Sequence, residues 1–145
     1  MSDAQALIEK LDLKPHPEGG WFKETWRDAA EAGVRSRATC IHFLLQAGQR
    51  SHWHTVDASE IWLYHSGDPL KLSLAESDAG PIRDVELSAD VLRGGQPHHV
   101  IKPHEWQAAE PMPGPHGYTL VSCIVAPAFE FEGFTLADTG WEPGA

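Results

Sequence analysis

The sequence is poor in basic residues. Of its 145 residues, 11 are Lys or Arg and 21 are Asp or Glu, so the formal net charge is −10 with His neutral. Proteins that bind nucleic acids or anionic membranes in general carry dense positive charge. We therefore expect neither a nucleic-acid nor a membrane partner.

Long apolar runs are also missing. No stretch approaches the roughly 18 consecutive apolar residues that a membrane-spanning helix requires. The first residues, Met1 to Gln5, lack the basic segment and apolar block of a secretory signal. These absences predict a soluble, cytoplasmic protein.

Cysteine is scarce, and its placement is uninformative for metal or redox chemistry. Cys40 and Cys123 lie far apart in apolar surroundings, with no CxxC pattern. Neither a disulfide framework nor a cysteine zinc site is indicated. We expect two buried thiols.

What the chain has in excess is His, Trp, Gly and Pro, with 9, 6, 13 and 11 residues. Such an excess of His and Trp favours a pocket in the folded protein. The length suits one domain spanning residues 1–145, which should bury roughly 70% of its unfolded surface.

Only the start of the chain has a helical pattern. Leu7, Ile8 and Leu11 fall on one face, and Ser2 with Gln5 can form a capping box, which predicts a short helix over residues 3–11. From residue 20 onward the apolar period is two, which is typical of strands. Strands are expected at residues 22–27, 39–45, 51–55, 59–66, 70–75, 82–87, 98–102, 106–109, 118–126 and 129–136.

Many short strands separated by Gly, Pro and Asp turns, without interleaved helices, favour an all-β antiparallel fold. We predict a jelly-roll barrel of about eight to ten strands over residues 20–136, with the helix packed outside and a loose or surface-docked tail at 138–145. The segments 21–27 and 37–46 would extend one sheet and leave an edge that a second subunit can cover, which predicts a homodimer.

The densest chemical segment runs from Gly48 to Gly67. His52 and His54 are two apart on a strand, so a regular strand projects both from one face. Glu60 follows on the next strand. Imidazole and carboxylate together suit a divalent transition metal such as Zn, Fe, Mn or Ni, so these three residues are the candidate metal ligands. The alternative is a solvated surface pair, since short HxH patterns are common.

Glu60, Trp62 and Tyr64 are spaced to share one face of their strand. A second segment, ending in Trp106 and Gln107, can close the same pocket, although plain core packing explains Trp106 equally well. An inward-facing carboxylate needs a metal, a cationic partner or a hydrogen-bonded ligand, because an unpaired buried charge is very costly. A purely structural role is therefore the least favoured reading.

Several long motifs also carry a resemblance. The HxH pair, Glu60 and Gly67 are similar to the first motif of the cupin superfamily. More specifically, five segments resemble the fifth cupin family, a branch known chiefly as a domain of unknown function. They are residues 15–27, 38–45, 59–70, 106–109 and 118–129. The resemblance implies a jelly-roll barrel of RmlC-like type, usually dimeric, grouped with metal-free sugar-nucleotide epimerases. It implies no established reaction.

The chain departs from metal-binding cupins in its second motif. That motif, Pro-x-Gly-x-x-His, would fall on residues 103–108, where Glu105 replaces the turn glycine and Ala108 replaces the last ligand. His104 or Gln107 could substitute only in a shifted register. The spacings around His52, His54 and Glu60 also differ from the metal-binding pattern.

Three functions remain open. The first is binding of a small polar, sugar-like ligand by His54, Glu60, Trp62, Tyr64, Trp106 and Gln107. The second is an enzyme, either metal-dependent through His52, His54 and Glu60, or a metal-free isomerase in which His54 removes a proton and Tyr64 or Tyr118 returns one. The third is a structural β-domain without a ligand.

Overall fold

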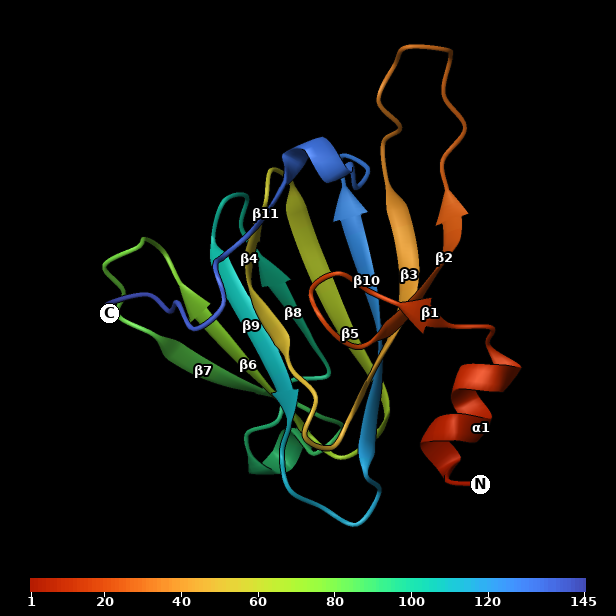
Figure 1. Cartoon of the computed structure of the whole chain (residues 1–145), viewed down its shortest axis with the longest axis vertical. Coiled ribbons are helices and arrows are strands. Elements are labelled where there is room, and N and C mark those ends of the chain that lie inside the picture. Colours follow the sequence, from red (N-terminus) through yellow and green to blue (C-terminus); the bar gives the residue numbers. More distant parts are fainter.

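The computed structural model describes all 145 residues, and its strands form two antiparallel sheets that pack face to face (Figure 1). The first sheet has the order β1-β2-β3-β10-β5-β8 and the second the order β11-β4-β9-β6-β7. The elements are α1 (Asp3–Lys10), β1 (Lys14–Pro15), β2 (Trp21–Arg27), β3 (Thr39–Gln46), β4 (Ser51–Val56), β5 (Ser59–Gly67), β6 (Leu70–Ala75), β7 (Arg83–Leu87), η1 (Val91–Arg93), β8 (His98–Ile101), β9 (Trp106–Pro111), β10 (Tyr118–Ala126), η2 (Phe131–Gly133) and β11 (Phe134–Leu136).

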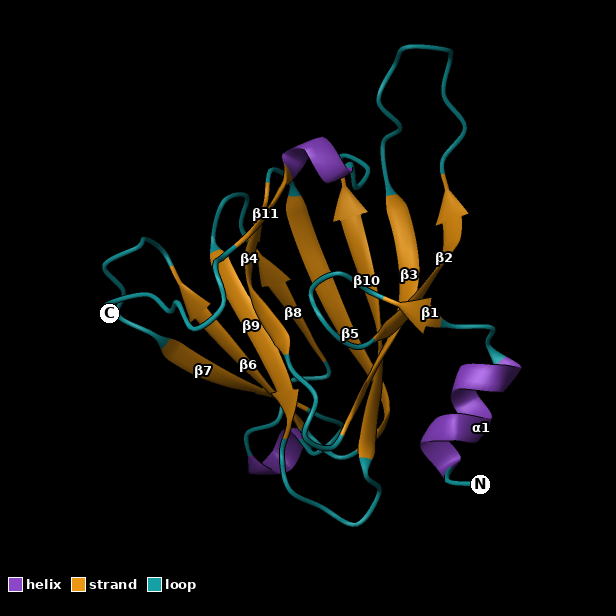
Figure 2. Cartoon of the chain, in the orientation of Figure 1, coloured by secondary structure: helices purple, strands orange, loops and turns teal.

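The all-β jelly roll expected from the sequence is confirmed, but it is a sandwich and not a closed barrel. The two sheets are not joined strand to strand, so β1 and β8 remain edges of the first sheet and β11 and β7 edges of the second. The strand expected at 129–136 is instead a loop, the single turn η2 and the short β11. Figure 2 shows how little helix there is beside the two layers of strands.

The N-terminal helix α1 forms where the sequence predicts it. The side chain of its N-cap, Ser2, accepts a hydrogen bond from the backbone N–H of Gln5 at 3.2 Å. Its apolar side packs outside the first sheet, in a cluster that includes Leu44, Tyr118 and Leu120. No helix of the structure has the length and apolar character needed to cross a membrane.

The main core fills the space between the sheets. It consists of side chains that the period-two pattern points inward, namely Phe43, Leu45, Trp62, Leu70, Leu72, Leu74, Leu87, Ile101, Ala109, Val121 and Cys123. Each large apolar side chain buried here contributes about 1.5–3 kcal/mol to folding. Cys123 is buried and Cys40 half-buried, and both are free thiols.

Strand β4 is irregular, and this decides which of its side chains face inward. Ser51 pairs with Ala109 and His54 with Gln107, so three steps along β4 match two steps along β9. A bulge of this kind breaks the alternation of faces. Ser51 and His54 are both fully buried as a result, whereas His52 is half-buried.

Candidate functional site

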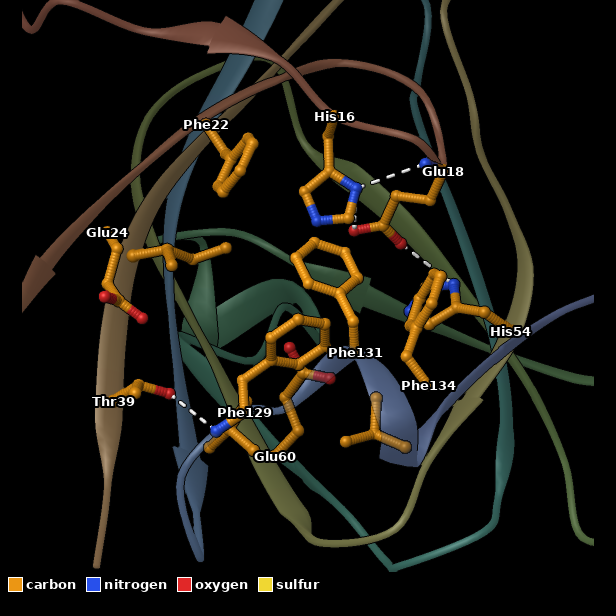
Figure 3. Close-up of a pocket in the computed structure, with 13 residues that line it drawn as sticks. His16, Glu18, Phe22, Glu24, Thr39, His54, Glu60, Phe129, Phe131 and Phe134 are labelled. Atoms are coloured by element: carbon orange, nitrogen blue, oxygen red, sulfur yellow. Dashed lines mark hydrogen bonds and ion pairs between the residues drawn. The ribbon is translucent and has the colours of Figure 1, made fainter. Parts of the chain in front are cut away.

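A cavity of about 210 Å³ opens between the sheets (Figure 3). Side chains from the turn after β1, from β2, β3, β4, β5 and β10, and from the segment around η2 and β11 line it. They are His16, Glu18, Phe22, Glu24, Thr39, Ile41, His54, Val56, Glu60, Val125, Phe129, Phe131 and Phe134.

The turn between β1 and β2 places two of these groups. Backbone hydrogen bonds join His16 N to Gly20 O at 2.9 Å and Gly19 N to His16 O at 3.0 Å. The turn is fastened to β4, because His52 N donates to Glu18 O at 2.8 Å. Gly19 has φ +110°, and a Cβ there would lie 2.1 Å from Arg50 O, so only glycine allows this approach.

Glu18 and His54 form a buried ion pair. His54 Nδ1 lies 2.9 Å from Glu18 Oε2 and 2.7 Å from the carbonyl oxygen of His52. Ser51 Oγ donates to the same carboxylate oxygen at 2.6 Å. These contacts fix the imidazole through Nδ1, which leaves Nε2 as the nitrogen available to the cavity.

The protonation of this pair follows from its geometry. Burial alone lowers the pKa of His54, but the carboxylates of Glu18 and Glu60 outweigh burial and raise it to about 9. Burial raises the pKa of Glu18, and His54 outweighs that effect, so the net direction is downward. The pKa of the neighbouring His16 is lowered, chiefly by burial. At neutral pH the cavity therefore holds one imidazolium paired with one carboxylate, and a neutral imidazole.

Glu60 is a second buried carboxyl group, and its surroundings differ. Gln107 Nε2 donates to Glu60 Oε1 at 3.0 Å, and Gln107 Oε1 in turn accepts from Trp62 Nε1 at 3.0 Å. The Cys123 thiol, which is also buried, is a neighbour of this carboxyl group and acts to lower its pKa. Burial, reinforced by the charge of Glu18 and opposed by His54, raises the pKa of Glu60 to about 7. Glu60 is therefore close to half ionised at neutral pH.

Phenylalanines form the apolar part of the cavity wall. The rings of Phe129, Phe131 and Phe134 meet edge to face, with centroids 5.0 to 6.2 Å apart. Phe134 also lies 5.3 Å from the His54 ring, and Phe22 lies 4.5 Å from His16. Figure 3 shows these rings around the space into which His54 and Glu60 point. The cavity thus combines aromatic walls with ionisable groups.

Of the candidates from the sequence, His54 and Glu60 line the cavity together. Trp62 and Gln107 lie one layer behind Glu60, buried and joined to it by hydrogen bonds. Both support the site without lining it.

The other aromatic candidates lie elsewhere. Tyr64 packs against the core and donates its hydroxyl to Gly67 O. Tyr118 packs beside α1 and donates to Ser66 Oγ at 3.2 Å. Trp106 is half-buried, packs against the tilted ring of Trp141 with centroids 4.5 Å apart and donates a hydrogen bond to Asp78. None of the three lines the cavity.

His52 does not join His54 and Glu60, because the β4 bulge turns it away. Its Nε2 lies 2.9 Å from the carbonyl oxygen of Asp138. No group of three or more His, Cys, Asp or Glu side chains in the structure is arranged to hold a metal ion. In the cavity, His54 Nδ1 is already bonded to Glu18. The residues present therefore do not fit the three-ligand centre expected from the sequence.

Sequence reasoning missed His16, Glu18 and the four cavity phenylalanines. The first two lie in Pro15-His16-Pro17-Glu18-Gly19-Gly20, where two prolines and two glycines frame a histidine and a glutamate. A rigid turn carrying two such groups could have indicated a site. The phenylalanines had no such signal, since apolar residues on strands are normally core.

Comparison with known proteins agrees with this fold. The family model described as cupin superfamily (DUF985) matches residues 5–137. No curated protein matches the chain. Among solved structures, a hypothetical protein from Leishmania major is 31% identical with a TM-score of 0.85, over 94% of this chain and 88% of that chain. A structural-genomics target from Shewanella oneidensis is 30% identical with a TM-score of 0.86, over 95% and 86%.

More distant structures share the fold alone. Oxalate decarboxylase from Bacillus subtilis is 14% identical with a TM-score of 0.62, over 87% of this chain and 30% of that chain. At this identity the likeness is evidence for the architecture alone.

Proposed function

The chain belongs to the DUF985 family of the cupin superfamily, and we propose that it binds a small organic molecule in the cavity between its sheets. The observation that carries the proposal is the lining: buried ionisable groups converge on one enclosed space whose remaining wall is aromatic. Ligand sites in proteins combine a mainly apolar pocket with a few placed polar groups in this way.

A purely structural role does not account for Glu60. A carboxyl group only 6% exposed, among apolar side chains, costs several kcal/mol of folding free energy when ionised without a cation. A packed β-domain would be more stable with an apolar residue there. A ligand that bonds to this carboxyl group gives the cost a functional reason.

The cavity is small for a ligand site. Its volume of about 210 Å³ lies below the roughly 300–1,000 Å³ of sites for drug-sized ligands. The ligand, or the part of it that is enclosed, therefore has one ring or a short chain. The polar, sugar-like ligand expected from the sequence becomes a ligand with one polar group and an apolar body.

The opposite protonation states of His54 and Glu60 favour a second candidate function, metal-free proton transfer to and from the bound molecule. At neutral pH His54 is protonated and can donate through Nε2, while a large share of Glu60 is ionised and can accept. Such a division between acid and base is typical of catalytic pairs. The structure thus favours Glu60 as the base and His54 as the acid, in place of His54 and a tyrosine.

The test uses Glu60→Gln, which keeps the size of the side chain and removes its charge. Saturation-transfer NMR with single-ring aromatic compounds and monosaccharides should show fragments that bind wild type and bind the variant about tenfold or more weakly. Glu31→Gln, in an exposed loop, is the matched control and should bind like wild type. In D₂O, deuterium exchange beside the carbonyl of a bound ketone or aldehyde reports proton transfer, and Glu60→Gln should abolish it.

Two results would count against the proposal. If no fragment binds the wild type, the cavity is not a ligand site. If Glu60→Gln binds every fragment like the wild type while its melting curve is unchanged, Glu60 has no part in binding.

A further inference from the structure

The charges around the cavity do not balance. The carboxylate of Glu18 is matched by the imidazolium of His54. Glu24, at the rim, is paired with Arg27 at 2.8 Å. No Lys or Arg side chain is among the residues that line the cavity. Glu60 is thus the one carboxyl group of the cavity without a cation of its own.

The neighbours of Glu60 do not supply that cation. Gln107 is a neutral amide, and burial holds the pKa of the Cys123 thiol well above its usual value, so the thiol stays neutral. His16 is the other imidazole of the cavity, and burial lowers its pKa. His54 interacts favourably with Glu60, but its proton on Nδ1 is held by Glu18.

The aromatic walls have the matching property. The face of a phenyl ring carries negative electrostatic potential and attracts a cation, and the attraction is strongest where water is excluded. Phe22, Phe129, Phe131 and Phe134 line the same cavity as Glu60. Aromatic rings and an unmatched carboxylate together form a site for a cation with an apolar body.

We infer that the ligand of this cavity is a small organic cation, a protonated amine whose ammonium group lies beside Glu60 and whose apolar body lies among Phe129 and Phe134. This inference rests on the proposed function and names its ligand class. Phosphorylated and carboxylate ligands are disfavoured, because they would meet Glu60 with no Lys or Arg to balance them. The net charge of −10 further attracts cations to the molecule.

The test compares three probes of one size: benzylamine, benzyl alcohol and benzoate, as cation, neutral molecule and anion. Calorimetric titration at about pH 8, where Glu60 is mostly ionised, should show benzylamine binding about tenfold or more tighter than benzyl alcohol, with no binding of benzoate. At about pH 6 most of Glu60 is protonated, so the affinity for benzylamine should fall while that for benzyl alcohol stays constant.

Two variants separate charge from folding. In Glu60→Gln, the affinity for benzylamine should fall to that for benzyl alcohol. The affinity for benzyl alcohol should stay within about twofold of its wild-type value. Phe134→Leu keeps an apolar wall but removes a ring face. It should therefore weaken the binding of benzylamine about threefold or more and weaken the binding of benzyl alcohol less. Glu31→Gln should change neither ligand.

The outcomes distinguish this inference from the proposed function. If benzyl alcohol or benzoate binds as tightly as benzylamine, the cation inference is overturned and ligand binding in the cavity stands. If benzylamine binds with the same affinity to Glu60→Gln, the inference is likewise overturned. If none of the three binds, the inference is overturned, and ligand binding is decided separately by the fragment panel.

Discussion

At the scale of residues, the cavity depends on how Glu18, His54 and Glu60 share charge. Glu18 is ionised because the His54 imidazolium lies beside it, and His54 is protonated because the Glu18 carboxylate lies beside it. Glu60, with neutral donors only, has a pKa of about 7. All three groups are buried, yet Glu18 and His54 are both ionised at neutral pH, whereas Glu60 is only partly ionised. The difference is the charge of the nearest hydrogen-bond partner.

The pKa values predict that the free energy of unfolding falls as pH rises above the acidic range. Glu60 has a folded pKa of about 7 against an ordinary value of 4.5, so its contribution is full below about pH 4.5 and is lost as pH rises through 7. His54, raised from 6.5 to about 9, loses its contribution between those values. The Glu18 pKa is lowered, so its contribution is lost only below its unfolded value of about 4.5.

Urea denaturation of wild type and Glu60→Gln between about pH 5 and pH 9 measures this. The wild type should lose at most about 3 kcal/mol through Glu60, and the variant should lack the part of the decline that ends near pH 7. A wild type more stable at pH 8 than at pH 5.5 would contradict the assignment, as would identical profiles for the two proteins.

At the scale of elements, two irregular segments build the site. The turn between β1 and β2 carries Glu18, and the bulge in β4 turns His54 inward. A backbone hydrogen bond from His52 to Glu18 joins the turn to the strand. The ion pair therefore depends on the close approach of these two backbones at Gly19.

Gly19→Ala should separate the turn from β4. The added Cβ would meet Arg50 O at 2.1 Å, with φ +110° adding strain, so we expect a destabilisation of about 1–3 kcal/mol and weaker pairing of Glu18 with His54. NMR titration of His54 should then show its pKa shifted down toward 6.5. Gly33→Ala is the control: its φ is +80°, but nothing lies within 4 Å of the added Cβ, so the pKa of His54 should not change. If His54 titrates in Gly19→Ala with the same pKa as in the wild type, this role of the turn is refuted.

At the scale of the whole molecule, the outer face of the six-stranded sheet carries one apolar row of side chains. In-register pairing places Trp26, Cys40, Ile124, Ile61 and Val100 in one row across five strands. Trp26 and Val100 are 50% and 53% exposed. A second copy of the chain covering this face would remove that apolar surface from water.

The sequence predicts a homodimer that covers a sheet edge. We propose instead that the homodimer forms through this row on the sheet face. Sedimentation velocity at micromolar protein should give twice the chain mass of 16.0 kDa. Ile124→Glu, at the centre of the row, should shift the protein to monomer, and Leu92→Glu, at a fully exposed position in η1, should not. A wild-type mass near 16 kDa would exclude the dimer at this concentration.

The sequence by itself determined the features that depend on local pattern. The period of two predicted the strands and put Glu60 and Trp62 on one face and Ile61 on the other, and the capping residues predicted α1. Periodicity alone favours the apolar Ile61 face as the core, and the structure buries the Glu60 face instead. His54 and Glu60 were found because polar residues at inward positions are costly and therefore informative.

Only the tertiary structure decided which side chains meet. His52 left the site because a bulge, which depends on the pairing of β4 with β9, reversed its face. Glu18 reached His54 from a turn 36 residues earlier in the chain, and the phenylalanines came from the far end. Alternation along a strand is fixed by local backbone geometry, whereas bulges and contacts between distant segments are fixed by how the two sheets pack.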